Sequence, residues 1–120
     1  MIFVKINERL YPALVVGKIT DSGWDNRASK SITLEMDYET AKETFVDGLA
    51  WSIVQRDEHP VYDENGNPTG TSTIKENTFD NSEYCIAGDI TVHRDGTITA
   101  KMGKLTDLEE AYEIMLGGVE

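Results

Sequence analysis

Two runs of alternating apolar and polar residues flank an Asp-Gly dipeptide, and this arrangement constrains the fold more than any other feature of the sequence. Apolar side chains alternate from Tyr84 to Val92 before Asp95-Gly96, and from Ile98 to Met102 after it. A period of two is typical of half-buried strands, and Asp-Gly between two such runs predicts an antiparallel hairpin. We therefore expect an antiparallel sheet in the C-terminal half of the chain.

The N-terminal half repeats this pattern. Residues 2–6 and 9–20 are rich in aliphatic and β-branched side chains and flank Asn7-Glu8, which predicts a second hairpin. Further strands are expected at 31–36 and 49–56. Because no strand–helix–strand alternation runs through the chain, a doubly wound parallel sheet is disfavoured. The sequence predicts an α+β fold: a mostly antiparallel sheet, or a small barrel or sandwich, with two short helices.

The helices are expected at about 38–46 and 107–116. The first follows Asp37, a good N-cap residue, and ends at Asp47-Gly48. The second shows apolar residues at helical spacing, which form one stripe: Leu108, Ala111, Tyr112, Met115 and Leu116.

A capping box marks the start of the second helix. Thr106 is followed three residues later by Glu109, so each can bond the backbone of the other. We expect the apolar stripe of this helix to pack on the sheet, with binding to a partner as the alternative. The sheet face expected to receive it carries Ile86, Ile90, Val92 and Ile98.

The length of 120 residues is that of one domain, so residues 1–120 are expected to form a single domain. Within it, residues 57–80 are polar and contain a turn-rich run at 63–70. We expect this segment to be a mobile loop or the protruding tip of a long hairpin. Residues 71–75 could pair weakly with 52–58.

The charge and the apolar content exclude several classes of protein. With 11 basic and 22 acidic residues, the net charge of −11 disfavours strong electrostatic binding to nucleic acid or to an anionic membrane. No apolar run has the length of a transmembrane helix, and no signal-peptide pattern is visible. A single Cys cannot form an internal disulfide. We expect a protein made in the cytoplasm.

Few residues are suited to catalysis or metal binding. Cys85 could be a nucleophile only with a nearby base, and the two histidines, His59 and His93, lie in no known motif. The acidic run at Asp63 resembles the opening of a calcium loop, but Ile74 occupies the position of the last ligand. We therefore expect no catalytic residue, no cofactor and no metal.

The candidate interaction residues are Trp24, Leu108, Tyr112 and Met115. Trp24 lies in a polar loop and could anchor a protein partner. We expect it instead to fold back and cover the core. A protein partner or a second copy of the chain is the expected kind of ligand.

Two stretches of the sequence resemble those of known proteins. Residues 24–55, from Trp24-Asp-Asn-Arg to Trp51-Ser-Ile-Val-Gln, and residues 80–115 are similar to small proteins encoded among the tail and baseplate genes of prophages in Gram-positive gut bacteria. The resemblance carries no motif tied to chemistry. It implies a virion or assembly component that is synthesised in the cytoplasm and can enter a phage particle.

Three functions remain open at this point. The preferred one is a non-enzymatic, phage-derived structural or assembly protein that acts through protein–protein contacts. The alternative is an acidic inhibitor that mimics nucleic acid, because most of the excess negative charge lies in the C-terminal half, with Glu109, Glu110 and Glu113 on one helix. A small hydrolase that uses Cys85 is the third.

Overall fold

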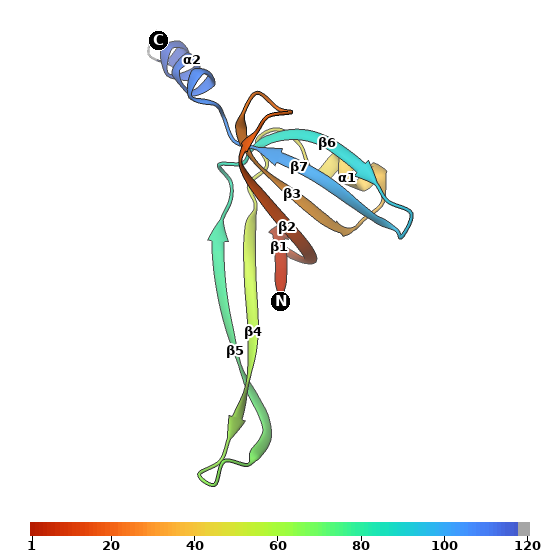
Figure 1. Ribbon diagram of the computed structural model, residues 1–120, viewed down its shortest axis with the longest axis vertical. Helices are drawn as coiled ribbons and strands as arrows, with labels where there is room; N and C mark the ends of the chain where they lie inside the picture. The colour runs from red at the N-terminus through yellow and green to blue at the C-terminus, as the bar shows by residue number, and fades with distance from the viewer. Residues whose placement is uncertain (118–120) are drawn as a thin grey trace.

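The computed structural model describes residues 1–117, with the side chains of Glu113, Ile114 and Leu116 left out of the description. Within this range, seven strands form one open sheet in the order β5-β4-β1-β2-β3-β7-β6 (Figure 1). All neighbouring strands are antiparallel. The elements are β1 (Ile2–Ile6), β2 (Arg9–Asp21), β3 (Arg27–Glu35), α1 (Tyr38–Thr44), β4 (Ser52–Tyr62), β5 (Pro68–Asp80), β6 (Ile86–Val92), β7 (Thr97–Gly103) and α2 (Asp107–Gly117). The predicted α+β class is confirmed, with an open sheet in place of a closed barrel.

Both predicted hairpins are present. Asn7 and Glu8 connect β1 to β2 with φ angles of 50° and 67°, as a two-residue turn between right-twisted strands requires. The β6–β7 connection has four residues between the strands, 93–96, in place of a two-residue turn. His93 N donates to Thr97 O at 2.9 Å, and Gly96 has a φ of 90°, a conformation that glycine adopts without strain.

The core lies on one face of the sheet, beneath α1. Alternating residues of β3 and β7 point into it, and the segment that contains α1 covers them. Its buried members are Val4, Ile6, Ile32, Leu34, Ala41, Phe45, Trp51, Ile98, Ala100 and Met102. Each large aliphatic side chain buried here contributes about 1.5–3 kcal/mol relative to exposure. Asp37 caps α1 as predicted, since its carboxylate accepts a hydrogen bond from Thr40 N at 3.1 Å.

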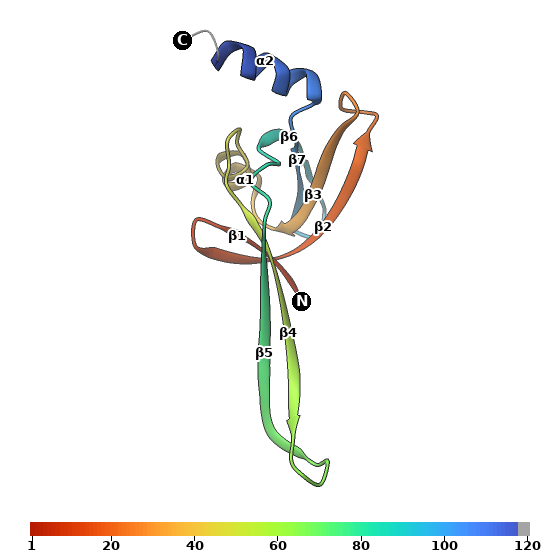
Figure 2. The ribbon, with the colours of Figure 1, turned by 90° about the vertical axis from the view of Figure 1, so that its left-hand side faces the viewer.

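The β4–β5 hairpin extends far beyond the rest of the sheet. β1 pairs with β4 only from Ser52 to Gln55, so the hairpin continues as a two-stranded ribbon, residues 56–76, which we call the arm. Figures 1 and 2 show the arm projecting from the sheet along the longest axis of the molecule, which measures 66 Å against 38 and 27 Å. The polar segment 57–80 is thus mostly strand, and its turn lies between Tyr62 and Pro68.

The C-terminal helix lies at the other end of the molecule. In both views α2 is directed away from the sheet (Figures 1 and 2). Apart from one ion pair described below, no part of α2 in the described chain packs against a strand or against α1. The predicted packing of its apolar stripe on the sheet is therefore wrong. Of the residues expected to receive it, Ile90 and Ile98 pack with the core, whereas Val92 is 61% exposed. The core beside Ile98 is filled by Ala41, Phe45 and Trp51.

Candidate functional site

Trp24 folds back onto the sheet, but on the face opposite the core. It packs beside Gly88 and Gly103, and Gly103 alternates along β7 with Met102, which is buried in the core. A Cβ atom added at Gly88 or Gly103 would lie 2.9 or 2.7 Å from the indole ring. The absence of these two side chains creates the space that the indole fills, and Trp24 is half-buried as a result.

A buried carboxylate fixes the start of the loop that carries Trp24. Asp21 binds Lys101 Nζ at 2.5 Å and accepts hydrogen bonds from Ser29 Oγ and Gly23 N, both at 3.1 Å. The hydrogen bond from Lys101 holds the pKa of Asp21 below its ordinary value of 3.8. Asp21 therefore has a structural role, because its carboxylate oxygens already bind groups of the same chain.

Arg27 joins the same loop to α2. Its side chain is only 5% exposed, and its guanidinium makes two parallel bonds to Glu109, Nη1 to Oε1 at 2.8 Å and Nη2 to Oε2 at 3.2 Å. It also donates to Lys104 O at 3.2 Å and lies 4.9 Å from the centre of the Trp24 ring. A bidentate pair fixes direction as well as distance. This contact therefore sets the direction in which α2 leaves the sheet.

The predicted capping box of α2 is confirmed. Glu109 accepts a hydrogen bond from Thr106 N at 2.9 Å, and Glu109 N donates to Thr106 Oγ1 at 3.2 Å. Glu109 thus has two roles, in the cap and in the ion pair with Arg27. The hydrogen bond from Arg27 lowers the pKa of Glu109 below its ordinary value of 4.5.

The apolar stripe of α2 is exposed wherever its side chains are described. Leu108, Tyr112 and Met115 are 81%, 63% and 69% exposed. Their spacing of i, i+4 and i+7 places them on one helical face. Leu105 extends this surface, and a shallow groove lies between it, Leu108 and Tyr112. The predicted stripe also included Leu116, whose side chain lies outside the described part. Neither described helix has the length and apolar content needed to cross a membrane.

The arm is the second exposed element. Every residue of β5 is exposed, and among residues 1–117 this strand contacts β4 alone. At the turn, the Asp63 carboxylate accepts hydrogen bonds from Asn65 N and Asn67 N, both at 2.9 Å. The run that resembles a calcium loop is therefore a turn closed by its own backbone.

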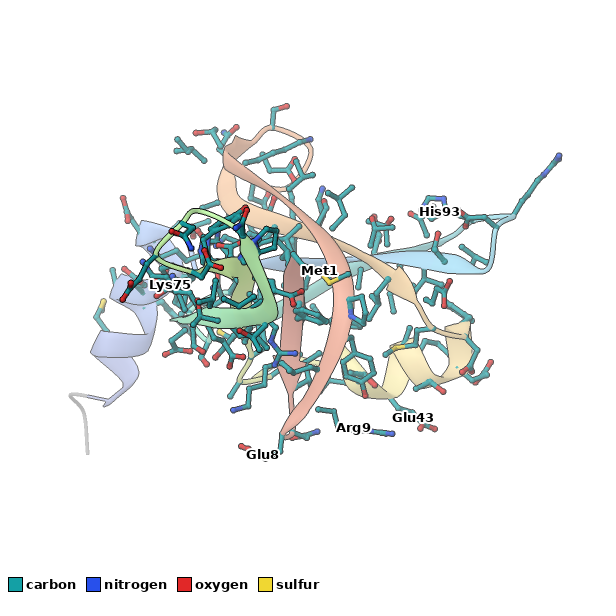
Figure 3. The ribbon with its side chains drawn as sticks, turned by 90° about the horizontal axis from the view of Figure 1, so that it is seen from below. Met1, Glu8, Arg9, Glu43, Lys75 and His93 are labelled. Atoms are coloured by element: carbon teal, nitrogen blue, oxygen red, sulfur yellow. The ribbon has the colours of Figure 1, made fainter. Side chains whose placement is uncertain are left out.

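The residues suited to catalysis lie apart from one another. Cys85 precedes β6 and His93 follows it, so the length of the strand separates them, about 3.3 Å for each residue. Figure 3, a view along the arm, shows His93 at the far end of the sheet, away from the arm, which carries His59. His93 Nε2 lies 2.7 Å from Thr99 Oγ1. Among the described side chains, no group of three or more His, Cys, Asp or Glu could hold a metal ion.

No protein-family model matches this chain, and neither a curated protein nor a solved structure is significantly similar.

Sequence reasoning located some of these features and missed others. It identified Trp24 and the α2 stripe, but not Arg27, which holds both in place. The sequence feature that could have indicated Arg27 is its position three residues after Trp24, where the chain must return from the loop to the sheet. The full length of β5 was also missed, although Thr69, Thr71 and Thr73 alternate as β-branched residues do in strands.

Proposed function

We propose that this protein is a non-enzymatic structural or assembly protein, derived from a phage, which binds other protein subunits through the arm and α2. The single observation that carries the proposal is the placement of these two exposed elements at opposite ends of the molecule (Figure 1). A subunit of this shape can contact one neighbour at each end. The resemblance of residues 24–55 and 80–115 to prophage tail-region proteins supports the phage origin.

The arm supports a binding role because of its poor intrinsic stability. An isolated two-stranded ribbon is marginally stable in water, because it has no third strand and no covered apolar face. In the arm, β5 is exposed along its whole length of 13 residues. Contact with a partner would supply the burial that the ribbon lacks.

The helix α2 supports a binding role for a similar reason. A helix of 11 residues is short for independent stability, and helices of this length usually depend on packing of an apolar face. Leu108, Tyr112 and Met115 present such a face to solvent. Anchors at i, i+4 and i+7 are typical of helices that bind in an apolar groove of a partner.

The test is to search for the protein in phage particles and in their assembly intermediates after prophage induction, by mass spectrometry. We expect it in at least one of these fractions. A chain with a shortened arm, in which Asn-Gly replaces residues 58–74 between the paired residues Asp57 and Lys75, should fold but stop particle assembly. The control is Glu43→Gln, a change at an exposed position outside both the arm and α2. Absence of the protein from both fractions would contradict the proposal.

A further inference from the structure

Strand β2 presents apolar side chains to solvent on the face of the sheet opposite the core. Alternate residues of a strand point to opposite faces, and Tyr11, Ala13 and Val15 pack against the core. Leu14 and Val16 therefore point away from it, and they are 65% and 54% exposed. The residues that pair with them on β3 are a threonine and a serine, which leave room for a helix. We call Leu14 and Val16 the β2 patch.

The charge beside the β2 patch is positive. Lys18 lies two residues beyond Val16 on the same face of the strand and is exposed. It forms no ion pair within the described part of the chain. The one acidic residue of β2, Asp21, is buried and already bound to Lys101. A partner of the β2 patch therefore needs an apolar surface with a carboxylate at one end.

The helix α2 has such a surface. It contains no Lys or Arg, and Asp107 and Glu110 are exposed on either side of Leu108 in the sequence. Neither carboxylate forms an ion pair with a described residue. Two α2 stripes placed against each other would bring these carboxylates together, and like charges across an interface oppose binding. The stripe of α2 therefore fits a basic apolar surface better than a second α2.

The α2 helix of the same molecule does not cover the β2 patch. Arg27, whose side chain is 5% exposed, holds Glu109 by two bonds. In both views α2 runs away from the end of β2 (Figures 1 and 2). Folding α2 back would break this ion pair and leave a buried guanidinium without its carboxylate, which is costly. The β2 patch is therefore open to α2 of another molecule.

We propose that α2 of one molecule packs on the β2 patch of a second copy of this chain, with Leu108 over Val16 and Tyr112 over Leu14. The inference rests on the proposed assembly function and deepens it by naming the partner of α2. The contact joins two unlike surfaces, so it is head-to-tail. Contacts of this kind close into rings or continue as filaments.

The spacing of the side chains fits this arrangement. Leu108 and Tyr112 lie about 6 Å apart along the helix axis, at a rise of about 1.5 Å per residue. Val16 and Leu14 lie about 6.6 Å apart along the strand, at about 3.3 Å per residue. Both apolar side chains of the patch can therefore be covered by one helix that runs along the strand.

The charges select the direction of the helix. With Leu108 over Val16, the acidic start of α2 lies near Lys18. Glu35 lies at the other end of the β2 patch, one residue beyond Leu34, and Leu34 pairs with Ala13. A helix in the reverse direction would bring the start of α2 toward Glu35, where like charges would meet.

The test is the oligomeric state of the full chain, measured by sedimentation velocity from about 1 to 500 µM. We expect the unmodified protein to self-associate reversibly. Leu14→Thr and Leu108→Gln change exposed side chains, so both variants should remain folded by circular dichroism. Each should associate about tenfold more weakly, because each removes one side of the contact. The matched control is Val92→Thr, at an apolar position that is 61% exposed and outside both surfaces, and it should associate like the unmodified protein.

A mixture of the two variants tests whether the contact is head-to-tail. Leu14→Thr keeps an unmodified α2, and Leu108→Gln keeps an unmodified β2 patch. A one-to-one mixture therefore retains one intact contact, and it should form dimers that do not grow further. Pairing between identical surfaces predicts instead that one of the two variants associates normally on its own.

A charge variant tests the direction of the helix. Lys18→Glu places a carboxylate beside those of α2 and should weaken association about tenfold or more, whereas Lys18→Arg should not. Equal association of these two variants would overturn the stated direction.

Three results would overturn the contact itself. They are a protein that remains monomeric at all concentrations, association that either Leu14→Thr or Leu108→Gln leaves unchanged, and a mixture that associates no better than each variant alone. None of these results bears on whether the protein occurs in phage particles, so the two proposals fail separately.

Discussion

Gly103 has space for a hydrogen atom but not for a methyl group. A Cβ atom there would lie 2.7 Å from the Trp24 ring and 2.8 Å from Arg27 Cδ. Gly103→Ala must therefore displace the indole, and we expect it to reduce the free energy of unfolding by about 1–3 kcal/mol, as overpacking does. Urea unfolding followed by circular dichroism measures this change.

Gly17 provides the matched control for Gly103. The nearest atom to a Cβ at Gly17 would be 3.8 Å away, an ordinary contact. Gly17→Ala should therefore be neutral or stabilise the strand by up to about 1 kcal/mol. In a Trp24→Ala background, the part of the loss that the indole causes should disappear, whereas the part caused by Arg27 Cδ should remain. Equal losses in the two glycine variants would contradict this explanation.

The ion pair between Arg27 and Glu109 makes the attachment of α2 dependent on pH. The pKa of Glu109 is lowered in the folded protein, mainly by the hydrogen bond from Arg27. Its contribution is therefore complete above the ordinary value of 4.5 and is lost as the pH falls through the lower, folded value. We expect the start of α2 to separate from Arg27 in this acid range, as followed by amide chemical shifts of residues 104–110.

Two variants identify the carboxyl responsible. Glu109→Gln should show the separated state already at neutral pH, since a neutral amide replaces the charged partner of Arg27. Glu110→Gln, a change at the exposed neighbour, should retain the transition. The prediction is wrong if the acid transition of Glu109→Gln matches that of the unmodified protein.

The sequence predicted where α2 begins, but not what α2 packs against. The capping box of Thr106 and Glu109 correctly predicted where α2 begins, because its signal is local. The packing of α2 was predicted wrongly, because an apolar stripe does not specify which surface covers it. The face that Ile98 contributes was already filled from α1, through Ala41 and Phe45.

The arm was difficult to predict for a different reason. Residues 57–80 have polar side chains on both faces of the ribbon, so the alternation that marks a half-buried strand is absent. Only β-branched residues such as Thr71 and Thr73 indicated a strand there. Trp24 was expected to fold back and cover the core, but it covers the opposite face of the sheet. The face that it covers depends on two glycines far along the chain, Gly88 and Gly103, and sequence spacing does not reveal such a contact.

The exposed stripe of α2 predicts an unusually small effect for a large-to-small substitution. Leu108→Ala should change the free energy of unfolding by less than about 0.5 kcal/mol, because the side chain is already in water. Leu34→Ala, at a buried position, should lower it by about 2–5 kcal/mol. Thermal or urea unfolding of the two variants compares them. A loss above about 2 kcal/mol for Leu108→Ala would mean that α2 packs on the sheet.

The dimensions of the whole molecule can be measured in solution. Its radius of gyration is 18.6 Å, whereas a compact domain of this length has about 14 Å. Small-angle X-ray scattering of the monomer should give the larger value. Replacing residues 58–74 with Asn-Gly should bring it several ångström closer to the compact value. An unchanged radius in the shortened chain would show that the arm folds against the sheet.

Alternate amides of β5 face β4 and solvent, so they should exchange with deuterated water at two different rates. Because Asn81 N donates to Trp51 O, the odd-numbered residues from Thr73 to Phe79 bond to β4, and their amides exchange only when the ribbon opens. The even-numbered amides from Ser72 to Asp80 face solvent and exchange at nearly the rate of an unfolded chain. Contact of a partner with this edge would slow the even-numbered set and leave the odd-numbered set less altered. The ratio of the two rates, followed as a partner is added, would then report the fraction of molecules whose edge is covered.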